Sequence, residues 1–462
     1  MLLERLIANI VTNLKKAAPR FELGIKDLQS SALPLGHAAV KDANHSDNNL
    51  NRTRVNSLLI ISNGHGEDVI ALELIKKFLK TREFNKIEVM PLVGNGNIFN
   101  SLKDTSFRKI GNLKVLPSGG FSNQSFKGLI LDLISGLLII SFKNWKIVRS
   151  KSKEEFKIIA VGDLLPLLFA WSSSCDFGFI GTPKSDYTWS SGPGWSISDL
   201  YHQLKGSEWD PWEMSIMKSS RCKAIIMRDS LTAENLKKKS INANYFGNPM
   251  MDFLKKNTLK LQSISSFKRI ILLIGSRFPE ALNNLDSFLS CLDIYEISSI
   301  CLVLVPLSNN ANIKKVEKVF KSHGFIEQKQ IFSLGEESVW SKNNIFLLLG
   351  KSTFNEWSSL AQVGLANAGT ATEQIAGLGI PSLSYPGSGP QFTRGFALRQ
   401  SRLLGGSVLV FKDKKYLVKR LDMLLHDKEK RDEQAKMGIE RMGDKGASEN
   451  IVLYLRKKLL SQ

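Results

Sequence analysis

The 462-residue sequence is poor in cysteine and in acidic residues. Its four cysteines have no CxxC spacing and are too few for a disulfide scaffold in a chain of this length, which favours a reducing compartment such as the cytosol. Against 63 lysines and arginines stand 43 acidic residues, so the formal net charge is +20. Such a surface attracts polyanions: anionic lipid, nucleic acid or phosphorylated substrates.

Recognised nucleic-acid motifs are also missing. The sequence has no zinc-finger spacing, no RNP-like aromatic motif and no concentrated basic arm, because its lysines are spread along the chain. We therefore expect no nucleic-acid partner. Charge alone keeps a nucleic-acid binder as an alternative, which a salt-sensitive, sequence-independent affinity for DNA would support.

The beginning of the chain does not resemble a signal peptide, since Glu4 and Arg5 interrupt the apolar stretch and no small-residue cleavage site follows. Residues 42–54 are polar and rich in asparagine, as in a disordered linker. We expect residues 1–54 to be a partly disordered N-terminal extension without chemistry.

Regular alternation of apolar runs and helical patterns begins after residue 54 and predicts an α/β fold with parallel sheets. The expected strands of the first series are 57–62, 87–92, 157–161 and 224–227, and those of the second series are 269–274, 300–305, 346–349, 363–366 and 380–385. We predict two doubly wound, Rossmann-like domains, 55–247 and 248–425, facing a central cleft, followed by a helical segment, 426–462.

Two segments of the first domain are unusual. Residues 126–142 form a stretch of about 17 mostly apolar residues, short of the roughly 20 that span a bilayer. This stretch fits either a buried core helix or a helix at a membrane surface, and the basic residues after it favour the surface. Residues 188–212 carry four tryptophans among glycine, serine and proline, and they predict an insertion that is either a lid or a small satellite core.

A candidate anion site follows the first strand of the second domain. Gly275 and Ser276 form a short turn before a helix that we expect Pro279 to open, so free backbone N–H groups would face a ligand. Arg277 adds a cation that suits a diphosphate. The alternative is a tight turn with a solvent-exposed arginine.

A second candidate site is the turn Asn367–Gln374. Gly369, Thr370 and Ala371 would let backbone approach a ligand at a helix start. Glu373 has two interpretations that its spacing does not separate. It either closes a capping box with Thr370 or accepts hydrogen bonds from ribose hydroxyls.

A loop rich in glycine and proline covers residues 385–397. Its polar tail holds Gln391, which suits sugar hydroxyls, and Arg394, which suits a phosphate or an acidic neighbour.

The first domain supplies the candidate bases. Asn63, Gly64, His65, Gly66 and Glu67 form the glycine turn after the opening strand. A second such turn contains Asn95, and Asp163 lies in the turn after the expected strand 157–161. Attack by a sugar-acceptor hydroxyl needs a base, and imidazole or carboxylate can serve. The structural alternatives are a turn residue for the histidine and a helix N-cap for the aspartate.

In order along the chain, the motifs NGHGED (63–68), VGNGN (93–97), VGDLLP (161–166), FGNPMMD (246–252), LLIGSR (272–277) and NAGTATEQ (367–374) resemble lipid-A-disaccharide synthase and its relatives, a family of GT-B glycosyltransferases. The resemblance covers roughly 55–410. The opening turn departs from it, with His65-Gly66-Glu67 where the family usually has Ser-Gly-Asp. The segment 391–397 is more similar to the sugar-reading QxxNA element of the peptidoglycan transferase, with glycine and phenylalanine in place of the asparagine.

The resemblance implies transfer of a UDP-bound amino sugar, such as N-acetylglucosamine, to a lipid-linked acceptor at the cytoplasmic membrane face, by inversion and without a metal or other cofactor. It places Arg277 at the diphosphate, Glu373 at the ribose, and Asp163 where the family has an essential aspartate, with Asp163 or His65 as the base. The alternatives are a UDP-GlcNAc 2-epimerase-like enzyme and a catalytically silent nucleotide-binding scaffold.

Overall fold

The computed structural model describes residues 57–112, 137–192, 197–254, 264–294, 299–309, 311–387 and 392–460. Chain contacts separate Met1–Thr53 from Arg54–Gln462, and every described residue belongs to the second unit. The expectations for residues 1–54, and for the greater part of the apolar segment 126–142, lie outside the described residues.

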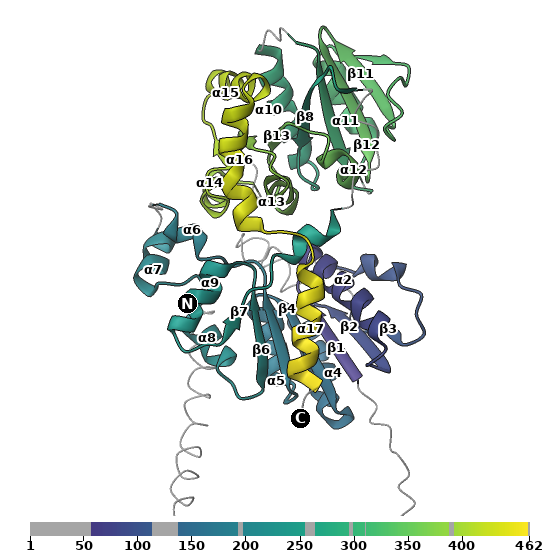
Figure 1. Ribbon diagram of the computed structural model, residues 1–462. Helices are drawn as coiled ribbons and strands as arrows, with labels where there is room; N and C mark the ends of the chain where they lie inside the picture. Colours follow the sequence, from purple (N-terminus) through teal and green to yellow (C-terminus); the bar gives the residue numbers. More distant parts are fainter. Residues whose placement is uncertain are drawn as a thin grey trace, which may run out of the picture. The chain divides into compact units, whose positions relative to one another are not determined.

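The first domain is built on a seven-stranded parallel sheet with the order β3-β2-β1-β4-β5-β6-β7 (Figure 1). Its strands are β1 Ser57–Ser62, β2 Lys86–Pro91, β3 Phe107–Lys109, β4 Phe156–Gly162, β5 Phe177–Gly181, β6 Cys222–Met227 and β7 Ala243–Asn244. The order reverses direction between β1 and β4, as expected for a doubly wound fold.

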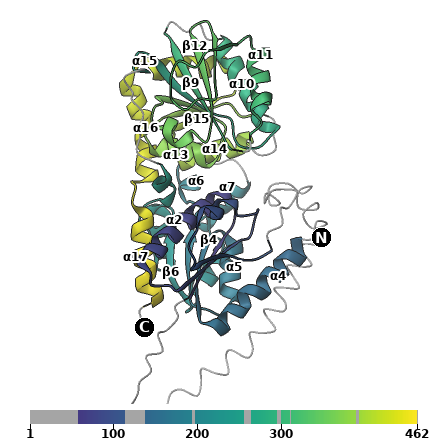
Figure 2. The same ribbon diagram turned by 90° about the vertical axis from the view of Figure 1, so that its right-hand side faces the viewer.

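Helices cover both faces of this sheet. They are α2 His65–Thr81, η2 Asn97–Ser101, α4 Leu137–Ser150, η3 Lys151–Glu154, α5 Leu164–Ser172, α6 Tyr187–Ser190, α7 Ile197–Lys205, α8 Pro211–Met217, α9 Ser230–Lys238 and η4 Pro249–Phe253. Alternation along β1 explains the two layers, since Leu58 and Ile60 belong to one core cluster and Leu59 and Ile61 to another. On the second of these faces, α4 and α5 lie side by side (Figure 2).

The second domain has an eight-stranded sheet with the order β10-β11-β12-β9-β8-β13-β14-β15. Its strands are β8 Lys268–Leu273, β9 Cys301–Leu307, β10 Ile326–Gln328, β11 Ser338–Lys342, β12 Ile345–Lys351, β13 Val363–Ala366, β14 Ser382–Ser384 and β15 Val408–Val410. The six strands from β12 to β15 in this order run parallel, while β10 and β11 add an antiparallel edge that the sequence pattern did not predict.

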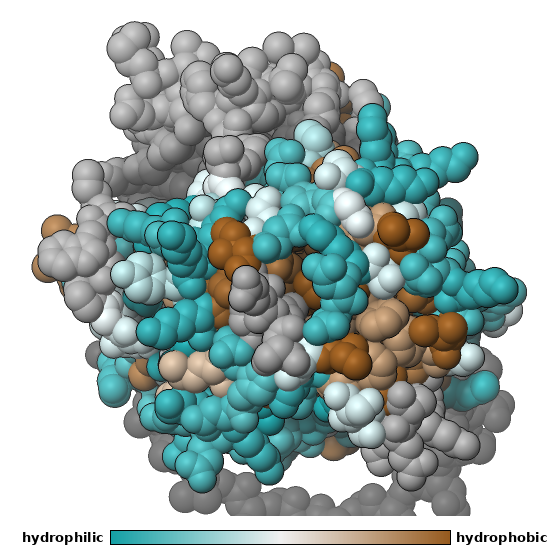
Figure 3. Space-filling model, turned by 90° about the horizontal axis from the view of Figure 1, so that it is seen from above, coloured by the Kyte–Doolittle hydropathy of each residue, from teal (hydrophilic) through white to brown (hydrophobic). Residues whose placement is uncertain are grey.

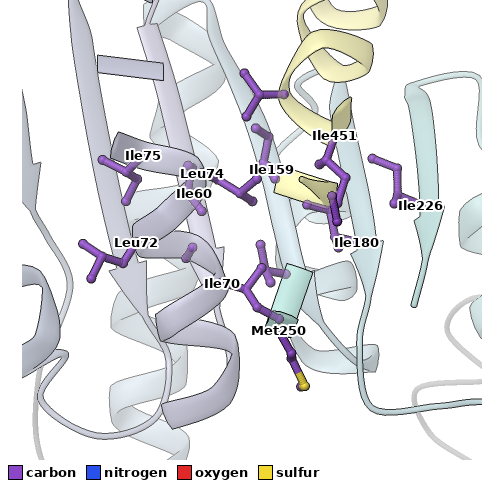
Figure 4. Packing of buried hydrophobic residues seen from close by; sticks show 14 of the residues in the cluster. Ile60, Ile70, Leu72, Leu74, Ile75, Ile159, Ile180, Ile226, Met250 and Ile451 are labelled. Carbon is purple, nitrogen blue, oxygen red and sulfur yellow. The ribbon is translucent and has the colours of Figure 1, made fainter. Parts of the chain in front are cut away.

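The helices after β8 are α10 Glu280–Ile294, α11 Ile313–Ser322, α12 Phe354–Ser358, α13 Thr370–Gly377, α14 Arg394–Leu403, α15 Lys414–His426, α16 Lys428–Met442 and α17 Ala447–Leu460. The last of them returns to the first domain, where α17 packs against α2 and β6. Ile451 of α17 joins Ile159, Ile180 and Met250 in one apolar cluster (Figure 4). The helical C-terminal segment is therefore shared between the domains.

The two doubly wound, Rossmann-like domains confirm the predicted fold class. From above, the surface is mostly hydrophilic, with hydrophobic residues gathered in separate patches (Figure 3). Within the described ranges, no helix combines the length and the apolar character needed to cross a bilayer.

Candidate functional site

Most of the predicted site residues that the structure describes lie in turns at the two points where the strand order reverses. In the first sheet that point is between β1 and β4, which lead into Asn63 and Asp163. In the second sheet it is between β8 and β13, which lead into Gly275 and Asn367. Ligands of open α/β sheets bind at the carboxyl ends of strands at such points. The topology thus selects the same four turns as the sequence motifs.

At the first of these points, the turns after β1 and β4 are joined by a hydrogen bond. Asn63 Nδ2 donates to Asp163 Oδ1 over 2.7 Å, and the same oxygen accepts from the backbone N–H of Leu165 at 3.1 Å. Asp163 is therefore the N-cap of α5, which is the structural role that the sequence predicts as the alternative to a base. It also holds the side chain of Asn63 in place, so the cap does not exclude a role at the site.

Glu67 lies in the first turn of α2 and points toward the same edge of the sheet. Its carboxylate accepts from the hydroxyl of Thr182, which follows β5, at 3.2 Å. Burial raises the pKa of Glu67 to about 7; hydrogen bonds from its backbone N–H and from Thr182 oppose this shift, and the negative charges of Asp163 and Asp68 add to it. By surface area, residue Glu67 is partly exposed. Glu67 is thus suited to exchange a proton near neutral pH.

Two glycines next to Glu67 have positive φ. Gly64 has φ 126° and Gly162 has φ 135°, both in the region that favours glycine. A Cβ on Gly64 would lie 3.4 Å from Glu67 Oε2, and one on Gly162 would lie 3.5 Å from Glu67 Cγ. These distances to Glu67 are ordinary van der Waals contacts, so the positive φ of the two turns, and not the space beside Glu67, is what favours glycine.

Asp68, the next residue, is buried and has a structural role. It accepts a hydrogen bond of 2.5 Å from the hydroxyl of Ser62. Burial raises its pKa to about 6, opposed by the Ser62 hydrogen bond and by the charge of Lys109. This carboxyl fixes α2 to the end of β1.

At the second reversal point, Gly275, Ser276 and Arg277 connect β8 to α10. Gly275 has φ 87°, and a Cβ there would lie 3.3 Å from the backbone oxygen of Asn367. The prediction that Pro279 opens the helix is wrong by one residue, because α10 begins at Glu280 and Pro279 belongs to the preceding turn. Burial lowers the pKa of Arg277, which Glu280 opposes.

Neutral side chains hold this edge together. Asn367 Nδ2 donates to Asn284 Oδ1 at 3.1 Å and to the backbone oxygen of Tyr385 at 2.8 Å, while its Oδ1 accepts from Ser384 at 2.9 Å. Gln400 Nε2 donates to the backbone oxygens of residues 368 and 369 at 3.1 Å. The ends of β8, β13 and β14 are therefore fixed by amides and hydroxyls.

The capping-box interpretation of Thr370 and Glu373 is not supported by the geometry. The N-cap of α13 is Gly369, without a side-chain cap, and Thr370 is already the first helical residue. This places Glu373 at the fourth helical position, one beyond the position that a capping box uses. Its Oε2 instead accepts from Arg228 Nη2 at 2.7 Å.

Arg228 and Thr182 are site residues that the motifs did not single out. Arg228 directly follows β6, is buried, and donates through Nη1 to the backbone oxygen of Thr182 at 3.1 Å. Burial disfavours its charge, but Glu373, Asp229 and Glu67 more than compensate, so the pKa of Arg228 is raised. In the sequence, the one feature that could have indicated Arg228 is its position directly after the expected buried strand 224–227.

The contacts described above do not include four of the predicted site residues, His65, Gln391, Asn95 and Arg394. His65 begins α2, but its side chain lies outside the described part, as does all of Gln391. Asn95 is exposed, and its backbone oxygen accepts a hydrogen bond from Lys109 Nζ at 3.0 Å. Arg394 is the first residue of α14 and is partly buried.

The turns of the two domains are in contact. A Cβ on Gly66 would lie 3.6 Å from the hydroxyl of Thr370, which opens α13. The tryptophan-rich insertion also contacts the second domain, since Arg402 of α14 donates to Asp199 at 2.8 Å and to the Thr188 backbone oxygen at 2.6 Å. Arg399 of the same helix pairs with the buried Glu208.

The tryptophans of this insertion have different environments. Trp209 is fully buried in a core cluster of the first domain, whereas Trp212 is 54% exposed. Among the side chains that the structure describes, no group of three or more His, Cys, Asp or Glu is arranged to hold a metal ion.

The chain matches no family model and no curated protein in sequence. Solved structures do share its fold. MnaA from S. aureus in complex with UDP gives a TM-score of 0.54 at 15% identity, over 88% of this chain and 97% of that one. UDP-GlcNAc 2-epimerase from Neisseria meningitidis bound to UDP-GlcNAc gives 0.50 at 16%, over 87% and 100%. A Listeria monocytogenes protein provisionally described as a UDP-N-acetylglucosamine 2-epimerase gives 0.53 at 14%, over 87% and 96%. The fold is thus of the GT-B type.

Proposed function

We propose that this protein is an enzyme of UDP-sugar chemistry, and specifically a glycosyltransferase that moves a sugar such as N-acetylglucosamine from UDP to a lipid-linked acceptor at a membrane surface. Solved neighbours of the fold were determined with UDP or UDP-GlcNAc, which supports the donor class. The observation that carries the catalytic part is the Glu67 carboxyl, with a pKa of about 7 at the point where the first sheet reverses its order.

The second domain would bind the donor. Gly275, Ser276 and the turn at Gly369–Ala371 offer backbone N–H groups near the starts of α10 and α13, where an anion is favoured. Arg277 would bind the diphosphate, and Glu373 would accept from the ribose. Gln391 and Arg394, on the loop leading into α14, would contact the sugar and a phosphate. No metal ion is required in this scheme, because the cationic and N–H groups stabilise the leaving diphosphate.

The first domain would supply the base. Near pH 7 Glu67 is available both as a carboxylate and, after reaction, as a carboxylic acid. Asp163 already accepts two hydrogen bonds at one oxygen, which suits a group that positions Asn63 and an acceptor hydroxyl. His65 stays a second candidate for the base. Asn63, Gly64, Gly66 and Asn95 would then form the acceptor side.

The proposed step is a single displacement. The acceptor hydroxyl oxygen forms the bond to the anomeric carbon, and its proton passes to Glu67. The bond between that carbon and the diphosphate oxygen breaks, and UDP leaves with the electron pair. Attack from the face opposite the leaving group inverts the anomeric centre.

A lipid-linked acceptor is supported by the apolar surface next to Asp163. The helix that Asp163 caps, α5, exposes Leu165 and Leu168, and the adjacent α4 exposes Ile139 and Phe142. Two cations lie on α4 beside these residues: Lys146 over the ring of Phe142 at 4.7 Å and Arg149 over the ring of Trp145 at 5.7 Å. Aromatic, aliphatic and cationic groups together suit the interface of an anionic bilayer.

A 2-epimerase is the second candidate, favoured by the neighbours of the fold that are described as UDP-GlcNAc 2-epimerases. Such an enzyme removes the proton at C2 of the sugar and returns it from the other side. Glu67 and Asp163, both on this edge, would serve that reaction as well. An epimerase has no need of the apolar surface on α4 and α5.

Calorimetric titration of the full chain with UDP and UDP-GlcNAc tests the donor half. We expect micromolar binding that weakens by about tenfold or more in Arg277→Ala and Glu373→Gln, since each loses a charge-assisted hydrogen bond. Lys412→Ala, on the loop before α15, is the matched control and should bind like the parent. A parent protein that binds no uridine nucleotide contradicts the proposal.

Vesicle flotation separates the two candidates. The full chain should float with vesicles that contain anionic lipid, and Phe142→Ser, at a position that is 54% exposed, should reduce the bound fraction by about threefold. Leu453→Ser, which changes a residue of similar exposure on α17, is the control and should float like the parent. Equal flotation of both variants would remove the surface of α4 from the acceptor site.

A further inference from the structure

The proposed reaction assigns no step to Arg228, yet this residue connects the two domains at the candidate site. It directly follows β6 of the first sheet, and its side chain is 5% exposed. Its guanidinium donates to Glu373 of α13 in the second domain and to the backbone oxygen of Thr182 in the first domain. A buried guanidinium is costly unless it is paired, so this contact is an important part of the domain boundary.

The contact occupies only one side of the Glu373 carboxylate. Arg228 bonds Oε2, and no donor within the described ranges bonds Oε1. The Glu373 side chain is 12% exposed, so it is held in place and still accessible. A carboxylate fixed through one oxygen presents the other in a single direction, and a ribose hydroxyl can donate to it there.

Resting on the proposed role of Glu373 at the ribose, we propose that Arg228 is a positioning residue for the nucleotide, acting through Glu373 from the opposite domain. Nucleotide affinity is then a property of both domains together. The second domain alone provides the carboxylate, and the first domain fixes its direction.

The same guanidinium reaches the base. Arg228 holds the backbone of Thr182, and the Thr182 hydroxyl donates to Glu67. The series Glu373, Arg228, Thr182 and Glu67 thus runs without interruption from the ribose contact to the proton acceptor. Correct placement of the donor and orientation of the base depend on one residue.

Calorimetric titration of the full chain with UDP tests the inference in a double-mutant cycle. We expect Arg228→Met to weaken UDP binding by about tenfold, and Arg228→Lys to restore part of the loss, because lysine keeps the charge but not the paired geometry. Because Arg228 acts through Glu373, the double variant Arg228→Met/Glu373→Gln should bind UDP within about twofold of Glu373→Gln alone.

Arg402→Met is the matched control. Arg402 also crosses the domain boundary, to Asp199 and the Thr188 backbone oxygen, but it does not contact Glu373. Its loss should leave UDP affinity within about twofold of the parent. Equal weakening by Arg402→Met and Arg228→Met would show a general effect of domain association and overturn the inference.

Other outcomes are also decisive. If the parent binds UDP and Arg228→Met binds it equally well, or if the effects of the two single changes add in full, Arg228 does not act through Glu373. If Arg228→Met fails to fold, Arg228→Lys is the deciding variant. The positioning role is excluded if Arg228→Lys binds UDP like the parent while Glu373→Gln binds UDP more weakly. Absence of UDP binding in the parent instead contradicts the proposed function itself.

Discussion

The carboxyl ends of the two sheets have the same topology but different chemistry. At the first sheet the reversal point gathers the ionisable groups Glu67 and Asp163, and Asn63 is hydrogen-bonded to Asp163. At the second sheet the equivalent point is built from Asn284, Asn367 and backbone oxygens. The first edge thus carries carboxyl groups, and the ends of β8, β13 and β14 at the second edge are held by amides and hydroxyls.

Under the proposed function, this difference gives each domain a separate task. Neutral amides do not titrate in the physiological range, so the ends of β8, β13 and β14, which these amides fix, should keep their shape as pH changes. A partly buried carboxyl with a raised pKa responds to pH and to the charges around it. The second domain is thus suited to binding, and the first to the proton transfer that accompanies reaction.

The largest expected effect is that of Glu67→Gln. The amide retains the size of the side chain and can still accept from Thr182, but it cannot take a proton. Turnover with UDP-GlcNAc should fall by about 10²- to 10⁴-fold, with UDP affinity within about threefold of the parent. Steady-state kinetics beside UDP titration measures the two quantities.

Asp68→Asn is the control for Glu67→Gln. Asp68 is the neighbouring acid with a raised pKa, but it is buried against Ser62 and faces the interior. Turnover should stay within about threefold of the parent, since no proton of the reaction reaches it. A loss as large as that of Glu67→Gln would show that the local charge, and not the proton acceptor, matters.

A change at the second reversal point should lower the stability of the protein and leave the pH dependence of turnover unchanged. Asn367→Ala leaves Asn284, Ser384 and the Tyr385 backbone oxygen without their partner in a buried region. The free energy of unfolding should fall by about 2–4 kcal/mol. Denaturant unfolding measures this, with the exposed Ser276→Ala as the control, and the pH dependence of turnover should not move. A shifted pH profile would contradict the separation of tasks.

A smaller effect concerns the pH dependence of stability. The folded pKa of Glu67, about 7, lies above its usual value of 4.5, so the folded state binds a proton more tightly than the unfolded state. The resulting stability is complete below about pH 4.5 and is lost as pH rises toward and through 7. Between pH 5 and pH 8, the free energy of unfolding should therefore fall by about 2–3 kcal/mol less in Glu67→Gln than in the parent. Urea unfolding at several pH values measures the difference, and parallel curves for the two proteins would contradict the raised pKa.

The sequence predicted the architecture well because buried parallel strands leave a strong local signal. The runs at 57–62 and 363–366 form strands with those bounds, and the run at 224–227 lies within β6. β5 was missed because its five residues, FGFIG, include two glycines, which weaken the strand pattern. The antiparallel β11 was missed because only its pairing with β12 identifies it.

The site was predictable in its positions and less so in its contacts. Glycine turns after strands marked the residues at both reversal points. The pairing of Arg228 with Glu373 was not predictable, because 145 positions separate the two residues and their contact depends on how two domains meet. The raised pKa of Glu67 likewise results from surroundings supplied by β4 and β5, so no local pattern reveals it.

The most direct test of the central claim is to incubate the full chain with UDP-GlcNAc labelled in the sugar, with and without membrane lipid extract. Separation of water-soluble from lipid-extractable label, and of UDP-GlcNAc from its 2-epimer, follows both candidate reactions. We expect label to enter the lipid fraction only when extract is present, with UDP released in equal amount and the reaction lost in Glu67→Gln. Conversion of free UDP-GlcNAc to its 2-epimer without extract, and no label in lipid, would contradict the transferase.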